Sequence, residues 1–318
     1  MKILSLIYGF IVFVRNKLYD WNILKSKKVD GVEVICIGNI VVGGSGKTPA
    51  VQYFCKKYLA EGKKVGILSR GYKGKRENDL LLVRDESGIL ASALESGDEA
   101  FLHSLSLPVP VVVCSNRYEG AKYLKEKCGM EVVIMDDGFQ HRKLLKDKNI
   151  VLIDATNPFG GDNYLPKGRL RESVNELKRA DEIIITKSNY VNPENIEKIK
   201  SRIKKYGKKI FVATFEGDYF YDNLERKYSL DEIKDKKVLI FSSIANPNVF
   251  YNTIEKLKPA SIKQVTFDDH HAYTESEIEN LSKEAKKYDY LLTTEKDIVK
   301  VNREIPNLLV LKMKFNII

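Results

Sequence analysis

The sequence of 318 residues is poor in cysteine and contains no long apolar run. Its four cysteines, at positions 36, 55, 114 and 128, form no Cys-x-x-Cys pair, so we expect reduced thiols and neither a disulfide framework nor a zinc site. Residues 3–14 are almost wholly apolar but fall short of the roughly 20 that a membrane-spanning helix needs. No small-residue cleavage site follows them, so we expect no secretory signal peptide.

The composition is that of a folded protein with a basic excess. Hydrophobic residues make up 43% and charged residues 30%, which excludes a largely disordered chain. The net charge of +10 favours polyanionic partners, namely nucleic acid, anionic lipid or phosphorylated substrates. Nucleic-acid binding predicts a basic stripe with interleaved aromatic residues. The basic residues are instead dispersed except near the N-terminus, so we expect no nucleic-acid partner.

The N-terminal residues 1–24 have the pattern of an amphipathic helix. Apolar residues recur at steps of three and four, and basic residues follow them. This pattern predicts a monotopic helix on an anionic membrane surface; the alternative is a helix packed on the protein's own core. The apolar positions are Ile3, Ile7, Phe10, Val14, Leu18 and Trp21, and the basic ones are Arg15, Lys17, Lys25, Lys27 and Lys28.

A glycine-rich loop follows the apolar run 34–37 and is the strongest functional signal in the chain. Glycines let backbone N–H groups approach phosphate oxygens closely, and the N-terminus of the following helix favours anions. Lys47 can reach the β- and γ-phosphates, while the Thr48 hydroxyl can bind Mg²⁺. The loop is a variant of the Walker pattern, because Val41 stands where that pattern has its first glycine. The predicted nucleotide-binding residues are Gly43, Gly44, Ser45, Gly46, Lys47 and Thr48.

Strands and helices alternate after this loop. Short continuous apolar runs at 64–69, 109–114, 131–135, 149–154 and 182–187 are typical of parallel strands buried on both faces. We therefore predict an α/β, P-loop NTPase-like core over residues 25–207, with helices on both faces of a mostly parallel sheet. Residues 208–235 are predicted to form a pair of linking strands. Residues 236–318 are predicted to form a smaller α/β domain.

Two acidic residues end the apolar run 131–135. Asp136 and Asp137 are placed like the acid of a Walker B strand, and the sequence does not decide which of them binds Mg²⁺. Asp98 precedes an apolar helix and, on local grounds, is only an N-cap or first-turn acid. His270 and His271 follow aspartates at a strand end, where they could titrate near neutrality or lie unused in a surface loop.

A nucleotide-dependent switch protein is the main alternative among phosphate-loop proteins. It predicts a guanine-reading Asn-Lys-x-Asp segment. The nearest match, residues 294–297 (Thr-Glu-Lys-Asp), begins with the wrong residue.

Eight motifs in order along the chain resemble those of one family. They are GNIVVGGSGKTP, ILSRGYK, SGDEA, NRYEG, MDDGFQHRKL, LPKGRLRES, FDDHHAY and TTEKD. The resemblance covers nearly the whole chain, from about residue 15 to 300, and MDDGFQHRKL is its most specific motif. The chain thus resembles the tetraacyldisaccharide 4′-kinases, the lipid A 4′-kinases of Gram-negative bacteria.

The resemblance implies ATP- and Mg²⁺-dependent transfer of a phosphoryl group to the 4′-hydroxyl of an acylated glucosamine disaccharide 1-phosphate. It implies a peripheral enzyme on the cytoplasmic face of the inner membrane, without an obligate protein partner. Asp98 matches the catalytic base, and His270, or else His271, its support from the second domain. Positions expected near substrate or metal are Arg117, Gln140, His141, Arg171 and Glu172.

Overall fold

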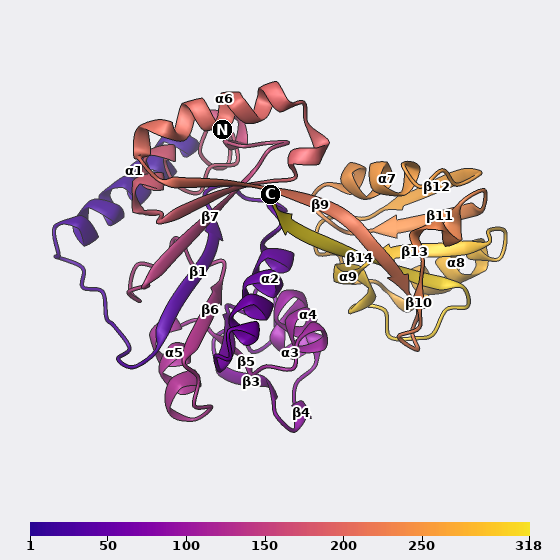
Figure 1. The fold of residues 1–318 in the computed structure, drawn as a ribbon, viewed down its shortest axis with the longest axis horizontal. Helices are drawn as coiled ribbons and strands as arrows, with labels where there is room; N and C mark the ends of the chain where they lie inside the picture. Colours follow the sequence, from indigo (N-terminus) through magenta and orange to yellow (C-terminus); the bar gives the residue numbers. More distant parts are fainter. The chain divides into compact units, whose positions relative to one another are not determined.

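The computed structural model describes residues 1–318, which divide into two compact units (Figure 1). The first comprises Met1–Phe215 and Phe315–Ile318, and the second Glu216–Lys314. Two neighbouring strands, β9 (Lys209–Tyr221) and β14 (Leu308–Ile317), contribute residues to both units. Within the predicted linking segment 208–235, β9 pairs antiparallel with the short strand β10 (Lys227–Tyr228). β14, which also neighbours β9, comes from the far end of the chain, which a local pattern cannot indicate.

The first unit is built on a sheet with the order β4-β3-β5-β2-β6-β1-β7-β8-β9. All pairings from β5 to β9 are parallel, and only the edge strands β3 and β4 are antiparallel. The strands are β1 (Glu33–Asn39), β2 (Val65–Ser69), β3 (Leu80–Asp85), β4 (Gly88–Ile89), β5 (Val111–Cys114), β6 (Val132–Asp136), β7 (Lys148–Asp154) and β8 (Glu182–Thr186).

Helices cover both faces of this sheet. α2 (Lys47–Ala60) and α4 (Asp98–Ser106) pack on one face, while α5 (Arg117–Glu126) and α6 (Pro193–Ile203) pack on the other (Figure 1). The strands are apolar on both sides because alternate residues of each enter opposite cores. This confirms the predicted α/β class. Shorter helices are α3 (Ala93–Ser96), Gly160–Asp162, Val174–Arg179, Ser188–Tyr190 and Lys204–Tyr206.

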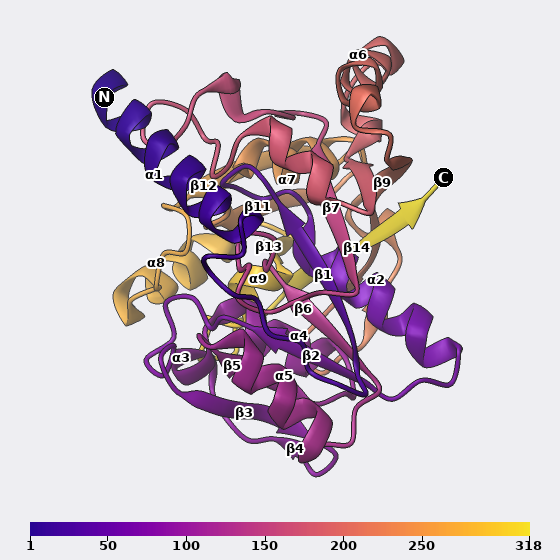
Figure 2. The same cartoon turned by 90° about the vertical axis from the view of Figure 1, so that its left-hand side faces the viewer.

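Helix α1 (Lys2–Asp20) begins next to the N-terminus of the chain (Figure 2). It packs on the rest of the first unit through its small and polar side. Its buried residues are Ser5, Gly9, Val12 and Asn16. Ser5 Oγ donates to the carbonyl of Tyr164 at 2.7 Å. A Cβ on Gly9 would stand 2.6 Å from the Tyr164 ring, so only glycine permits this approach. No helix of the protein has the length and apolar character to span a membrane.

The second unit has a sheet in the order β12-β11-β13-β14-β9, with β10 beside β9. The pairings from β12 to β14 are parallel. α7 (Pro247–Glu255) packs on one face and α8 (Glu275–Ala285) on the other. The remaining elements are β10 (Lys227–Tyr228), Leu230–Ile233, β11 (Lys237–Ser242), β12 (Ser261–Thr266), β13 (Tyr290–Thr294) and α9 (Glu295–Ile298).

Candidate active site

The glycine-rich loop joins the central strand β1 to helix α2, which begins at Lys47. Gly43 and Gly46 have φ angles of 128° and 81°, which side-chain-bearing residues rarely adopt. No side chain caps α2, so the N–H groups of its first turn are left for a ligand. Within the loop, Asn39 Nδ2 donates to Ser45 Oγ at 2.9 Å. The loop therefore has the backbone of a phosphate cradle.

The outer side of the loop is held by the end of β8. Lys187 Nζ donates to the carbonyl of Gly44 at 2.6 Å and pairs with Asp154 at 2.5 Å. Thr186 Oγ1 donates to the carbonyl of Ser45 at 3.0 Å. These two hydrogen bonds hold the carbonyls of the loop, so β8 fixes the loop conformation. Neither residue was predicted; the available signal was a lysine directly after a buried parallel strand.

Lys47 lies beside a carboxylate at the end of β6. Its Nζ is 3.8 Å from Asp137 Oδ2, and Arg171 Nη1 donates to both oxygens of Asp137, at 2.7 and 2.9 Å. Burial acts to raise the pKa of Asp137, but the charges of Lys47 and Arg171 outweigh it and lower that pKa. Asp137 is therefore ionised and compensated by two cations.

Asp136 is the other carboxylate at this strand end, and it is only 2% exposed. Its Oδ2 shares a hydrogen bond of 3.0 Å with Nε2 of the fully buried His103, while its Oδ1 is buried without a partner. An orphaned carboxylate oxygen is suited to a cation or an ordered water. His103 was not predicted, because a lone histidine on a helix carries no signal of this contact.

Helix α4 carries both His103 and the predicted base Asp98, which is its first residue. Glu99, next to Asp98, lies close enough to raise the pKa of Asp137 against its cations. Through Glu99 and His103, α4 lies close to both strand-end carboxylates.

Arg117, at the start of α5, is a buried cation in the same region. Its Nη1 donates to the carbonyl of Cys114 at 2.5 Å. Burial and the charge of Arg70 lower the pKa of Arg117 to about 10, while Asp137 and Asp136 oppose that shift. Arg117 therefore remains charged at neutral pH and lies close enough to both carboxylates to interact with them electrostatically.

Glu172 is fully buried, and both of its carboxylate oxygens accept hydrogen bonds from other side chains of the protein. Oε1 accepts from Arg15 at 3.1 Å and Asn16 at 3.0 Å, both on helix α1. Oε2 accepts from Gln140 at 3.3 Å and Arg179 at 2.5 Å. Glu172 therefore joins α1 to the segment that follows β6.

His141 lies next to Gln140 and has a buried Nε2 without a hydrogen-bond partner. Burial and the charge of Arg117 lower the pKa of His141 to about 4. The imidazole is therefore neutral at physiological pH.

The two adjacent histidines of the second unit have different surroundings. His271 Nε2 bonds Glu277 at 3.0 Å, and its ring stacks on Phe267 with centroids 5.0 Å apart. His270 has a φ angle of 60°, and its backbone N–H donates to the carbonyl of Ser243 at 3.1 Å. Its Nε2 is 4.0 Å from Asp269. His271 is thus held by Glu277 and Phe267 of its own unit, whereas the carboxylate contact of His270 is the longer of the two.

A buried carboxylate organises the loop beneath His270. Asp297 Oδ1 accepts from the N–H of Ser243 at 3.0 Å and from the hydroxyl of Tyr273 at 2.9 Å. Lys300 lies 3.2 Å from the same oxygen. This network explains why the TTEKD and FDDHHAY motifs occur together: the first supplies the acid and the second the tyrosine.

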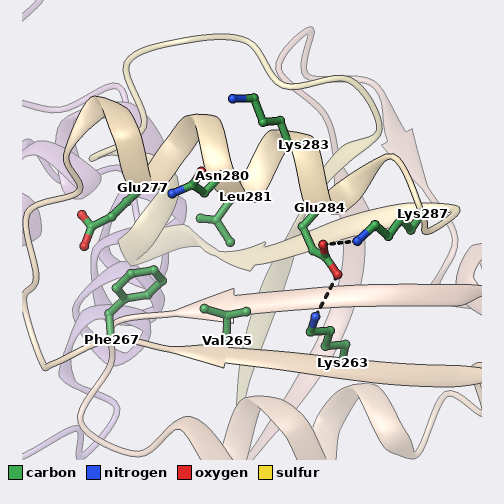
Figure 3. A pocket seen from close by; sticks show the side chains of 9 residues that line it. All are labelled: Lys263, Val265, Phe267, Glu277, Asn280, Leu281, Lys283, Glu284 and Lys287. Carbon is green, nitrogen blue, oxygen red and sulfur yellow. Dashed lines mark hydrogen bonds and ion pairs between the residues drawn. The ribbon is translucent and has the colours of Figure 1, made fainter.

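A groove of about 580 Å³ lies between α8 and β12 of the second unit (Figure 3). In it, Glu284 pairs with Lys263 at 2.8 Å and with Lys287 at 2.7 Å. It contains none of the predicted site residues, and its central carboxylate is already paired with these two lysines. We assign the groove no catalytic role.

Comparison with known proteins identifies the family. The family model of tetraacyldisaccharide-1-P 4′-kinase (LpxK) matches residues 1–317. The chain belongs to the tetraacyldisaccharide 4′-kinase family. The tetraacyldisaccharide 4′-kinase of Halothermothrix orenii is 36% identical over 96% of this chain and 83% of its own length. That of Bdellovibrio bacteriovorus is 36% identical over 95% and 89%, respectively.

A solved member of the LpxK family has the same architecture. The crystal structure of LpxK from Aquifex aeolicus in complex with ATP matches with a TM-score of 0.78 and 34% identity, over 99% of this chain and 93% of that chain. The resemblance read from the eight motifs is therefore confirmed at the level of family and fold.

Proposed function

We propose that this LpxK-family kinase transfers the γ-phosphoryl group of ATP to the 4′-hydroxyl of an acylated glucosamine disaccharide 1-phosphate, a lipid A precursor. The observation that carries the proposal is the convergence of Lys47, Arg171 and Asp137 beside the phosphate loop. Phosphoryl transfer needs in-line placement and charge neutralisation, and this cluster supplies fixed charge at the point where β- and γ-phosphates would lie.

The residues around the loop fit a magnesium ion. Asp136 has an unpartnered buried oxygen, and the Thr48 hydroxyl is in the first turn of α2. Asp137 already has two cationic partners, so we favour Asp136 as the carboxylate that holds the ion. No cluster of three or more His, Cys, Asp or Glu residues has metal-binding geometry, so the ion would share its shell with phosphate and water. Bound Mg²⁺ would neutralise phosphate charge during transfer.

Asp98 is proposed to accept the proton of the acceptor hydroxyl. The hydroxyl oxygen then forms a bond to the γ-phosphorus, the bond from that phosphorus to the β,γ-bridging oxygen breaks, and its electron pair leaves with ADP. Helix α4 supports this role because it bonds Asp136 through His103 and brings Glu99 near Asp137. A carboxylate is a weak base, so a partner that stabilises its protonated form is useful.

His270 is proposed to be that partner. Its neighbour His271 is held by Glu277 and Phe267, which favours His270 of the two. We propose that Arg117, Gln140, His141 and Arg171 border the acceptor sugar. Glu172 is buried beneath them and positions Gln140 without touching the substrate.

Helix α1 is proposed to hold the enzyme on the cytoplasmic face of an anionic membrane, where its acceptor is embedded. Its predicted apolar stripe faces outward: Ile3, Ile7 and Phe10 are 73%, 51% and 67% exposed. A helix that buries small and polar residues and exposes large apolar ones is suited to the headgroup region of a bilayer. This supports the membrane alternative over packing on the protein's own core.

The test is a transfer assay with labelled ATP, Mg²⁺ and a detergent-dispersed acylated disaccharide 1-phosphate. We expect label in the lipid with the wild-type enzyme. Lys47→Ala and Thr48→Ala should each lower kcat at least about 10²-fold without unfolding the protein, because charge stabilisation dominates this chemistry. Near wild-type turnover in either folded variant would exclude the phosphate loop from the mechanism.

A further inference from the structure

One basic side chain at the phosphate loop has no role in the account above. Arg169 precedes Leu170, which pairs with Val41 in an isolated antiparallel bridge. The Arg169 N–H donates to the carbonyl of Gly160 at 2.9 Å, and its own carbonyl accepts from the N–H of Val42 at 2.8 Å. The backbone of Arg169 is therefore fixed to the first half of the phosphate loop.

The side chain of Arg169 lies over Gly43. Its guanidinium carbon and Nη2 are both 3.7 Å from the place where a Cβ on Gly43 would stand. Gly43 has no Cβ, so no side chain separates the guanidinium from the loop backbone that would wrap the phosphates. The residue is exposed, and its side chain makes no hydrogen bond or ion pair.

This lack of a partner distinguishes Arg169 from the other cations around the loop. Lys47 and Arg171 share Asp137, and Lys187 is paired with Asp154. The charges of these three are thus largely compensated before nucleotide binds. Arg169 has no such compensation, so its charge is available to the phosphates, and a guanidinium can bind two phosphate oxygens at once.

We propose that Arg169 binds the γ-phosphoryl group in the transition state, as an arginine supplied by the enzyme's own chain. The inference rests on the proposed kinase function. During transfer, negative charge is spread over the equatorial oxygens of the phosphoryl group, and a guanidinium aimed at them stabilises that state. A second source of phosphate, the 1-phosphate of the lipid acceptor, would use the same chemistry, and the experiment separates the two.

The experiment compares Arg169→Ala and Arg169→Lys with Lys167→Ala, which removes an exposed cation two residues away in the same segment. We expect Arg169→Ala to lower kcat roughly 10²-fold or more at saturating ATP and lipid. Arg169→Lys should recover part of the loss, because it keeps the charge but not the fork of donors. Lys167→Ala should stay within about threefold of wild type, since an exposed charge of this kind contributes little.

A binding measurement without lipid provides a second readout. Calorimetry of ADP and Mg²⁺ with and without aluminium fluoride, a mimic of the phosphoryl group in transit, should show tighter ADP binding with fluoride in the wild type. Arg169→Ala should lose most of that gain while binding ADP alone as wild type does. Unchanged kcat together with an unchanged fluoride gain would overturn the proposal. A raised KM for lipid at unchanged kcat would also overturn it and assign Arg169 to the 1-phosphate. If the wild type phosphorylates no lipid, the kinase proposal fails, and the fluoride measurement still tests Arg169.

Discussion

Replacing two phenylalanines of helix α1 should release the enzyme from membranes without disturbing its fold. Phe10 and Phe13 are 67% and 55% exposed and lie on the outward side of α1. Full burial of a large apolar side chain stabilises by about 1.5–3 kcal/mol. Scaled by these exposed fractions and set against alanine, the pair contributes about 1–3 kcal/mol to interfacial binding. That is a loss of roughly 5- to 150-fold in the partition coefficient, at tenfold per 1.4 kcal/mol.

The assay is co-sedimentation with vesicles of phosphatidylethanolamine and anionic phosphatidylglycerol. Alanine is the best helix former, so Phe10→Ala/Phe13→Ala keeps α1 intact. The matched control is Leu94→Ala/Leu105→Ala, which removes side chains that are 62% and 50% exposed on α3 and α4. The reasoning is refuted if the phenylalanine variant binds within threefold of wild type, or if the control loses as much. Deletion of residues 1–20 should weaken vesicle binding more than the two substitutions do, and leave the protein in the soluble fraction.

Three further outcomes are expected. Lys187→Met should weaken ATP binding about tenfold or more in calorimetry, because it frees the Gly44 carbonyl of the phosphate loop and leaves the half-buried Asp154 without its cation; unchanged affinity in the folded variant would argue against this. Asp98→Ala should cut kcat severely with ATP affinity intact, His270→Ala should cost about 10–10³-fold, and the double variant should be little worse than Asp98→Ala; fully multiplicative losses would mean that the two act independently. His141 has a folded pKa of about 4 against an unfolded value of about 6.5, so it contributes stability that is complete above pH 6.5 and is lost as the pH falls toward 4. Denaturant titrations should show that, between pH 6.5 and pH 4, the free energy of unfolding falls by about 1–2 kcal/mol less in His141→Asn than in the wild type. The same change of unfolding free energy with pH in both proteins would contradict this.

The fold of the core was predictable because its strands are continuous apolar runs. The prediction placed the ends of β1, β2 and β6 to within two residues. Strands that are buried on both faces contain few polar residues, so their apolar runs have clear ends. The edge strand β3 was missed: it is only partly buried and antiparallel, and its last two residues, Arg84 and Asp85, are charged. The course of β9 and β14 from one unit to the other depends on a pairing between distant parts of the chain.

The candidate site was predictable where a residue type has a position in a motif, as Lys47 and the two strand-end aspartates have. The supporting contacts were not. His103 under Asp136 and Lys187 under the loop depend on how helix and strand ends meet in space. The close approach of Gly9 on α1 to Tyr164 likewise requires the packed structure.

The central claim, transfer of the γ-phosphoryl group of ATP to the 4′-hydroxyl of the lipid acceptor, is tested most directly by locating the phosphate in the product. The enzyme is incubated with ATP, Mg²⁺ and the acylated disaccharide 1-phosphate, and the purified lipid is analysed by mass spectrometry and ³¹P NMR. The account predicts a second phosphomonoester, on the 4′-oxygen, formed by the wild type and absent with Lys47→Ala. Release of inorganic phosphate with the lipid unchanged, or a phosphate on another hydroxyl, would contradict it.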